Sequence, residues 1–199
     1  VSDFADGFAA KPYGFENSPL ERTISENVLN YSRIVRLREI MVDYGDGHKP
    51  LWASEFGWNS LPDTWRGEAS IWGDTTGDEQ IAYTLEAIDR AEREWPWLGG
   101  LILEQWQPDA SADNARWGFS LIDMNGQPTA LYDALAAYKW PDAATNGLYH
   151  PVTPYAQYSG IWTFGDLGAD IGWLETSDSQ LAFSFFGRSL AMLVRKDNY

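Results

Sequence analysis

The sequence predicts an α/β fold with a parallel sheet, followed by a shorter antiparallel β segment. Short apolar runs alternate with segments of helical periodicity three times between residues 1 and 141. Repeated strand–helix units of this kind imply parallel strands whose carboxyl ends share one edge of the sheet. After residue 146 no helical stripe occurs, and short β-type runs split by glycine are typical of an antiparallel sandwich.

The first unit is expected to be a strand within residues 4–13 followed by a helix over residues 25–44. The strand run ends in a loop at Pro12. Thr23 and Glu26 have the spacing of a capping box at the start of a helix. Gly45 is a typical residue to end that helix.

The second unit is expected to be a buried strand over residues 51–56, a long loop over 59–77 and a helix. Asp78 is the expected cap of this helix, which ends near Trp95. Apolar residues at i, i+4 and i+7 predict its core face. They are Ile81, Leu85 and Ile88.

The third unit is expected to be a strand over residues 99–106, a loop and a last helix. Pro128 suits the first turn of that helix because proline needs no amide hydrogen there. The inner face of the helix is predicted to carry apolar and aromatic side chains. They are Leu131, Leu135 and Tyr138.

The change of character near Asn146 predicts a domain boundary there. Residues 1–145 form the α/β part and residues 146–199 a partial β-sandwich, with β-type runs at 160–164, 181–186 and 190–194.

Composition excludes several classes of protein. The 199 residues hold 14 basic and 29 acidic side chains, a net charge of −15 that argues against nucleic acid as a partner. No window reaches the length of a membrane segment. The chain has no cysteine and 2 histidines, so neither thiolate nor three-histidine metal sites can form, and we predict no metal and no cofactor. The chain holds 11 Trp, 10 Tyr and 9 Phe residues, and 11 tryptophans are more than a core of this size usually needs.

Glu55 is the sharpest candidate for chemistry. It lies at the end of a predicted buried strand and is followed by Gly57 and Trp58. A carboxylate in that position costs desolvation energy unless it has partners or a task. Glycoside hydrolysis uses this combination, a fixed carboxylate beneath a sugar ring and an aromatic face beside it. The alternative is a glutamate that caps the strand or pairs with an arginine.

The ends of all three predicted strands carry polar and aromatic side chains. A cluster of this kind at one end of a parallel sheet is typical of a sugar-binding site. By strand alternation, the last two members of the cluster point to the same face. The residues are Lys11 and Tyr13, Glu55 and Trp58, and Glu104 and Trp106.

The string Lys-Pro-Leu-Trp-Ala-Ser-Glu-Phe-Gly-Trp at residues 49–58 resembles the seventh-strand motif of clan A glycoside hydrolases, especially those near families 5 and 39. Residues 4–14 look like the sixth strand of these (β/α)8 TIM barrels, and residues 99–106 like the eighth. Residues 116–135 are similar to the closing loop and last helix.

This resemblance implies a retaining glycoside hydrolase that acts on a β-linked oligo- or polysaccharide. Glu55 would be the nucleophile, Tyr13 would hydrogen-bond it, and Trp106 would be the stacking platform. The sequence departs from the family at Lys11, where a histidine is usual, and at Glu104, which can align with the family tryptophan. Residues expected to bind substrate are Lys11, Tyr13, Trp58, Glu104 and Trp106.

The barrel that the resemblance implies is incomplete in this chain. A (β/α)8 barrel needs eight units and about 250 residues, and only strands 6 to 8 are recognisable here. The acid/base Glu of the clan follows an Asn on the fourth strand, and no such pair stands at a strand end of this sequence. We therefore expect a fragment that is inactive alone and whose parent protein is active.

Two other functions stay open. One is a non-catalytic carbohydrate-binding protein on a degenerate barrel. The other is a structural α/β domain, in which the strand-end aromatic residues would point into the core. A role on polysaccharides suggests export, but the sequence shows no exporting signal, so localisation stays open.

Overall fold

The computed structural model describes residues 4–139, 142–145, 147–165, 168–170 and 179–194. The chain divides into two compact units, Val1–Lys139 and Trp140–Tyr199. The predicted boundary residue, Asn146, falls within the second unit and outside the described residues.

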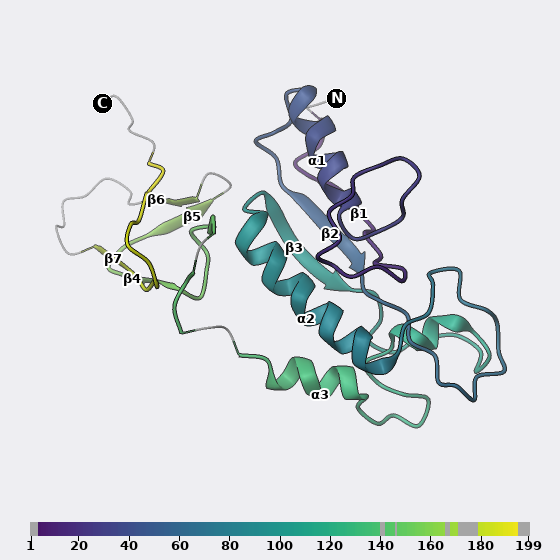
Figure 1. The fold of residues 1–199 in the computed structure, drawn as a ribbon. Coiled ribbons are helices and arrows are strands. Elements are labelled where there is room, and N and C mark those ends of the chain that lie inside the picture. Colours follow the sequence, from purple (N-terminus) through teal and green to yellow (C-terminus); the bar gives the residue numbers. More distant parts are fainter. Residues whose placement is uncertain (1–3, 140–141, 146, 166–167, 171–178, 195–199) are drawn as a thin grey trace. The chain divides into compact units, whose positions relative to one another are not determined.

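The first unit contains a parallel three-stranded sheet, so the predicted α/β class is confirmed (Figure 1). The strands lie in the order β1-β2-β3, and both pairs are parallel. Helices alternate with the strands as the sequence predicts. The elements are β1 (Phe8–Ala10), α1 (Arg33–Asp43), β2 (Leu51–Phe56), α2 (Gly77–Glu94), β3 (Leu98–Leu103), the short 3-10 helix η2 (Ala115–Phe119) and α3 (Ala130–Ala137).

The core of this unit lies between one face of the sheet and the helices α1 and α2. Leu51, Ala53 and Phe56 of β2 are at most 1% exposed and form the centre of it. Residues of both helices and the aromatic side chains near their ends complete the cluster. They are Tyr31, Ile34, Met41, Trp58, Ala87, Ala91 and Trp95.

The opposite face of the sheet is open. Trp52, which pairs with Gly100 in the parallel ladder, is 43% exposed, and Ile102 on the same side of β3 is 49% exposed. The ring of Trp52 lies over the backbone of Gly99 and Gly100, where any side chain would collide with it. The two glycines therefore allow the Trp52 ring to lie close to the backbone of β3.

Helix α1 is shorter than predicted, because it begins at Arg33 and not near residue 25. Thr23 does not cap a helix; its backbone amide and hydroxyl both donate to Glu21, at 2.9 and 2.6 Å. Glu21 also accepts a hydrogen bond from the side chain of Asn30 at 2.6 Å. These contacts hold the segment before α1 as a loop, so the Thr23–Glu26 capping box was a wrong prediction.

Helix α2 begins earlier in the chain than predicted, and it buries a different face. Thr76, not Asp78, forms the capping box, together with Glu79. The predicted stripe is only partly buried; the fully buried positions are instead Gln80, Thr84, Ala87, Arg90 and Ala91. Helix α3 is likewise capped by Thr129, so Pro128 lies before its first turn rather than inside it.

The second unit contains two small antiparallel pairs, which agrees with the antiparallel β segment that the sequence predicts. β4 (Ala156–Ser159) pairs with β7 (Gln180–Phe183), and β5 (Thr163–Gly165) pairs with β6 (Gly168–Asp170). The described residues 190–194 form no strand, in contrast to the prediction for that run. In the parts of both units that the structure describes, none of the helices has the length and apolar character of a membrane span.

Candidate functional site

Four of the six predicted site residues come together at the carboxyl ends of the three parallel strands. The chain after β1 continues beside β2, because Tyr13 forms a parallel bridge with Gly57. The backbone amide of Glu104 donates to the carbonyl of Phe56 at 3.1 Å, so the end of β3 follows the end of β2. The sheet thus places Lys11, Tyr13, Glu55 and Glu104 side by side.

Glu55 lies at the centre of this cluster. The Tyr13 hydroxyl donates to Glu55 Oε2 at 2.5 Å, and Lys11 Nζ lies 2.6 Å from Oε1. Tyr13 Oη is also 3.0 Å from Glu104 Oε2. The two carboxyl groups therefore share one phenol oxygen between them.

Aromatic packing holds Tyr13 in place. Its ring centroid lies 5.5 Å from that of Phe119 and 6.0 Å from that of Trp72. Trp72 and Phe119 also meet edge to face at 5.5 Å. A phenol fixed on two sides presents its hydroxyl in one direction, which favours a well-aligned hydrogen bond to Glu55.

The electrostatics of the site separate the two carboxyl groups. Burial acts to raise the pKa of Glu55, but the hydrogen bonds from Lys11 and Tyr13 outweigh it, and the pKa lies below its usual value. For Glu104, burial is the largest cause, and Glu55 adds to it through its contact and its charge, so the pKa is raised although the contact with Tyr13 lowers it. Burial and the two neighbouring carboxyl groups also raise the pKa of Tyr13, which stays protonated.

Exposure separates the same two groups. The side chain of Glu55 is 28% exposed and that of Lys11 59%, whereas that of Glu104 is 2% exposed. Substrate binding by Glu104 stays a prediction, and the Tyr13 hydroxyl lies against its carboxyl group. Glu55 is an accessible anion, the form that a nucleophile or a stabiliser of developing positive charge needs.

The structure contradicts the prediction for Trp58. It was predicted to bind substrate, but it is 1% exposed and lies in the core. Its ring packs on Tyr31 and Tyr83, with centroids 5.7 Å away in each case, and its indole nitrogen donates to the carbonyl of Asn17 at 2.8 Å. Gly57 before it adopts a φ of 147°, and this turn directs Trp58 to the helical side of the sheet.

Trp106 is exposed to 61%, as a stacking platform must be. Strand β3 ends at Leu103, however. Strand alternation therefore does not apply to Glu104 and Trp106, and it cannot place the two side chains on the same face. The ring meets Tyr132 of α3 edge to face, with centroids 5.8 Å apart.

Two residues of the site, Phe119 and Arg116, were not predicted from the sequence, and for Trp72 the sequence left open whether it lines a sugar subsite or packs the loop. Phe119 and Trp72 pack around Tyr13, and Arg116 Nε lies 3.9 Å from Glu104 Oε1. Trp72 belongs to a loop whose three tryptophans recur every seven residues, so sequence marked the loop without showing which ring it brings to the site. Nothing in the spacing of Arg116 or Phe119 pointed to Glu104 or Tyr13.

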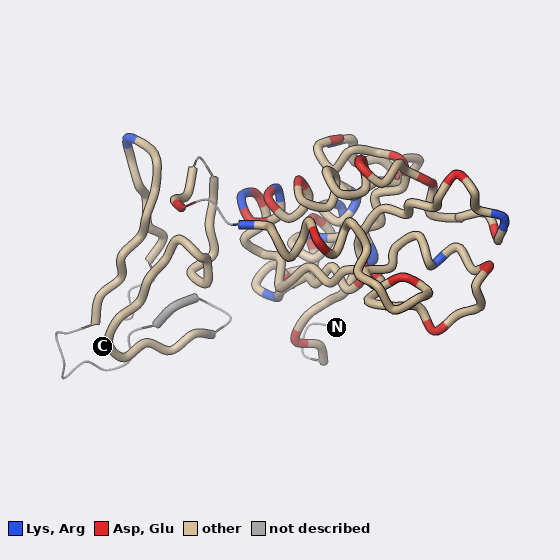
Figure 2. The backbone as a smooth tube through the Cα atoms, turned by 90° about the horizontal axis from the view of Figure 1, so that it is seen from below, with Lys and Arg blue, Asp and Glu red and all other residues tan. Residues whose placement is uncertain are grey.

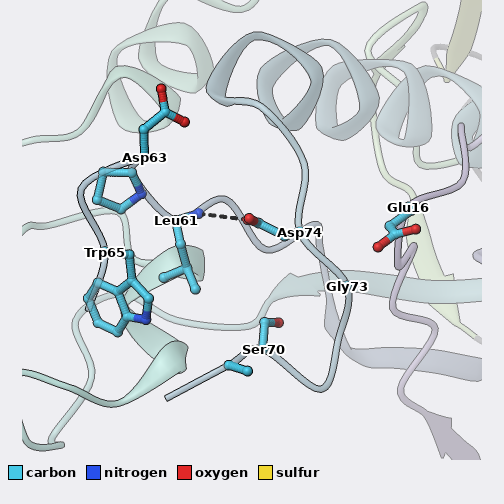
Figure 3. Close-up of a pocket in the computed structure, with 9 residues that line it drawn as sticks. Glu16, Leu61, Asp63, Trp65, Ser70, Gly73 and Asp74 are labelled. Atoms are coloured by element: carbon cyan, nitrogen blue, oxygen red, sulfur yellow. Dashed lines mark hydrogen bonds between the residues drawn. The ribbon is translucent and has the colours of Figure 1, made fainter. Parts of the chain in front are cut away.

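A cavity of about 420 Å³ lies in the loop between β2 and α2, and Glu16 from the chain after β1 closes one side of it (Figure 3). Asp74 at its wall accepts a hydrogen bond from the amide of Leu61 at 3.0 Å. Trp65 lines the cavity while its indole nitrogen donates to the carbonyl of Glu68 at 2.9 Å. The lining residues are Glu16, Leu61, Pro62, Asp63, Trp65, Ala69, Ser70, Gly73 and Asp74.

Among the described residues, no cluster of three or more His, Asp or Glu side chains has the arrangement of a metal site.

No protein-family model matches the chain. No curated protein matches it either. Among solved structures, the chain is similar to a family 39 glycoside hydrolase from the gut symbiont Bacteroides cellulosilyticus WH2, with a TM-score of 0.47 and 22% sequence identity. The alignment covers 68% of this chain and 27% of that one, so the chain spans about a quarter of the length of this structure.

Proposed function

We propose that the chain is part of a retaining glycoside hydrolase in which Glu55 is the nucleophile. The observation that carries the proposal is the state of Glu55, an accessible carboxylate at the carboxyl end of a parallel sheet, bonded to Tyr13 at 2.5 Å and to Lys11 at 2.6 Å. These donors keep the group ionised and fix its direction, as nucleophilic attack requires. The likeness of residues 49–58 to the seventh-strand motif is independent support.

In the proposed mechanism, Glu55 attacks the anomeric carbon of a β-linked saccharide. A bond forms between that carbon and a carboxylate oxygen while the glycosidic bond breaks, and an acid protonates the departing oxygen. A water molecule then cleaves the glycosyl ester and gives its proton to the same acid/base group, which restores Glu55. We place that acid/base residue on a strand outside this chain.

The open sheet face supports the view that further strands belong to the site. Trp52 and Ile102 leave a half-exposed apolar surface on the side where the remaining strands of a barrel would close. In such a barrel the carboxyl ends of the strands surround the active site. Glu55, Lys11 and the exposed ring of Trp106 are at these ends, where they could meet a sugar.

The test uses the full-length protein that contains this chain, with a panel of aryl β-glycosides. A 2-deoxy-2-fluoro glycoside should trap the intermediate, and mass spectrometry should locate the sugar on Glu55. Glu55→Gln should lower kcat/KM by at least about 10⁴-fold, because covalent catalysis is lost while the fold is kept. Glu86→Gln, an exposed change on α2, is the matched control and should have no effect. Turnover by Glu55→Gln that equals the wild type would refute the assignment.

A non-catalytic carbohydrate-binding protein is the second candidate. The ion pair favours it, because Lys11 neutralises the carboxylate that would have to attack. This candidate predicts that the full-length protein binds oligosaccharides, with loss of binding in Trp106→Ala, but turns over none of the glycosides. The third reading, a structural α/β domain, required the strand-end aromatics to lie in the core, which holds for Trp58 and not for the exposed Trp106.

A further inference from the structure

The hydroxyl of Tyr13 lies between one carboxyl oxygen of Glu55 and one of Glu104. If both glutamates were ionised, its single proton could not serve both contacts. Tyr13 Oη lies 2.5 Å from Glu55 Oε2 and 3.0 Å from Glu104 Oε2. A phenol carries one proton and can donate it to one acceptor at a time. The shorter distance assigns that proton to the bond with Glu55. The contact between Tyr13 and Glu104 then needs a proton of its own.

We propose that Glu104 is a positioning residue that keeps its proton and donates it to Tyr13, which in turn donates to Glu55. With this arrangement each of the two contacts of the Tyr13 oxygen holds one hydrogen. If Glu104 were ionised, two carboxylates would compete for one phenol proton. With that proton on the bond to Glu55, the Glu104 carboxylate would face the lone pairs of the phenol oxygen at 3.0 Å.

The surroundings of Glu104 agree with a neutral group. Its side chain is 2% exposed, and it shares the Tyr13 hydroxyl with the anionic Glu55. Burial is the largest cause of the raised pKa of Glu104, and the contact with Glu55 and the charge of Glu55 add to it, whereas the contact with Tyr13 acts in the opposite direction. Two groups approach its other oxygen: the amide of Gln105 at 3.4 Å and the Arg116 guanidinium at 3.9 Å, which favours the ionised form from a half-exposed position. Lys11 contacts Glu55 and not Glu104.

The inference rests on the proposed function for its consequence. Two hydrogen bonds in series polarise the phenol and strengthen its bond to Glu55. A neutral Glu104 adds no second negative charge beside the nucleophile, so the site carries Glu55 and Lys11 as a balanced pair. When Glu104 loses its proton at higher pH, this chain breaks, and catalysis should decline on the alkaline side.

The decisive measurement is the titration of the glutamate side chains by ¹³C NMR in the wild-type full-length protein, labelled at the carboxyl carbons. The Glu104 signal, identified by its absence in Glu104→Gln, should titrate above the ordinary glutamate pKa and that of Glu55 below it. Titration of Glu104 at or below the ordinary value would overturn the inference. The titration does not depend on turnover. If the full-length protein cleaves no glycoside, the proposed function is refuted, and the titration still decides whether Glu104 keeps its proton.

Kinetics supply a second test. Glu104→Gln keeps a donor toward Tyr13 but does not titrate, whereas Glu104→Leu removes the donor. We expect Glu104→Leu to lower kcat/KM by about 10–100-fold, the usual cost of removing a group that orients a reacting ligand, and Glu104→Gln, which keeps the donor, to lower it less. Equal losses in both variants would show that Glu104 only fills space. If either variant fails to fold, the wild-type titration still decides.

Discussion

At the residue scale, the site depends on how neighbouring groups set the charge of Glu55. Burial alone would raise its pKa, yet the ammonium of Lys11 and the hydroxyl of Tyr13 reverse the direction. The partners Tyr13 and Glu55 could be predicted because both stand where strands end. The burial of Glu104 and Trp58 could not, because it depends on the turn at Gly57 and on where β3 stops.

We expect Lys11→Met to move the acid limb of the pH–activity profile to higher pH. The pKa of Glu55 is lowered in the folded protein, so its carboxylate persists into the acid range; without the ammonium group the pKa rises, and the ionised fraction falls earlier as pH decreases. The measurement is kcat/KM across the acid range for the full-length protein. Lys139→Met, an exposed lysine after α3, serves as the control. An acid limb at the wild-type position in Lys11→Met would contradict the role given to this ion pair.

At the scale of elements, the sequence predicts best where one local signal dominates. The apolar run of β2 has the predicted bounds, Leu51–Phe56, because nothing competes with its burial between β1 and β3. The start of α1 was mispredicted because Glu21 and Asn30, nine positions apart, bind each other and the loop before the helix. A local capping pattern cannot reveal a contact of that range.

The end of α2 is tied to the loop before α1 by Glu94, and this contact should make stability depend on pH. Arg22 and Arg90 both bind the Glu94 carboxylate, at 2.5 and 3.0 Å for the closest atoms. The hydrogen bond from Arg22 is the largest cause of its lowered pKa, about 2, and Arg90 adds to it. Because the folded pKa is below the ordinary value of 4.5, this contribution is complete above about pH 4.5 and is lost as pH falls toward 2.

Glu94→Gln should therefore lower the free energy of unfolding at pH 7 by about 1 kcal/mol, a modest value because the pair is partly in water. The difference from the wild type should shrink as pH falls from 4.5 to about 2. Urea unfolding at several pH values measures both effects, and Glu86→Gln on the same helix is the control. A difference that stays constant over this pH range would exclude the ionic contribution.

Trp65 and Trp72, in the loop between β2 and α2, have different expected roles. Trp72 packs on Tyr13 and Phe119, whereas Trp65 lines the cavity (Figure 3). Under the proposed function, Trp65→Ala should raise KM for long oligosaccharides about three- to tenfold, the value of one aromatic stacking contact, with little change for aryl glycosides. Trp72→Ala should instead lower the free energy of unfolding by about 2 kcal/mol and reduce turnover of every substrate. Kinetics and urea unfolding on both variants distinguish the roles; equal profiles for the two would contradict them.

At the scale of the whole molecule, the acidic surface and the exposed apolar face around Trp52 favour different partners. Acidic positions are spread over the helices and loops of the first unit (Figure 2), in a chain with a net charge of −15. Such a surface repels polyanions and is compatible with neutral saccharides. The apolar face around Trp52 is the exception, and in the proposed barrel it would be covered by the strands that are not recognisable in this sequence.

Trp52→Lys tests that cover directly, because the cost of a charge depends on whether water reaches it. In this chain expressed alone, the position is 43% exposed, and the lysine ammonium can stay in water while only the packing over Gly99 and Gly100 is lost. In a closed barrel the same ammonium would be buried, and the cost should be greater by at least about 3 kcal/mol. Urea unfolding of wild type and variant in both forms gives the two differences, with Trp52→Phe as the control for lost ring area. Equal costs in the two forms would mean that this face is not covered in the longer protein, and the barrel would have to be abandoned.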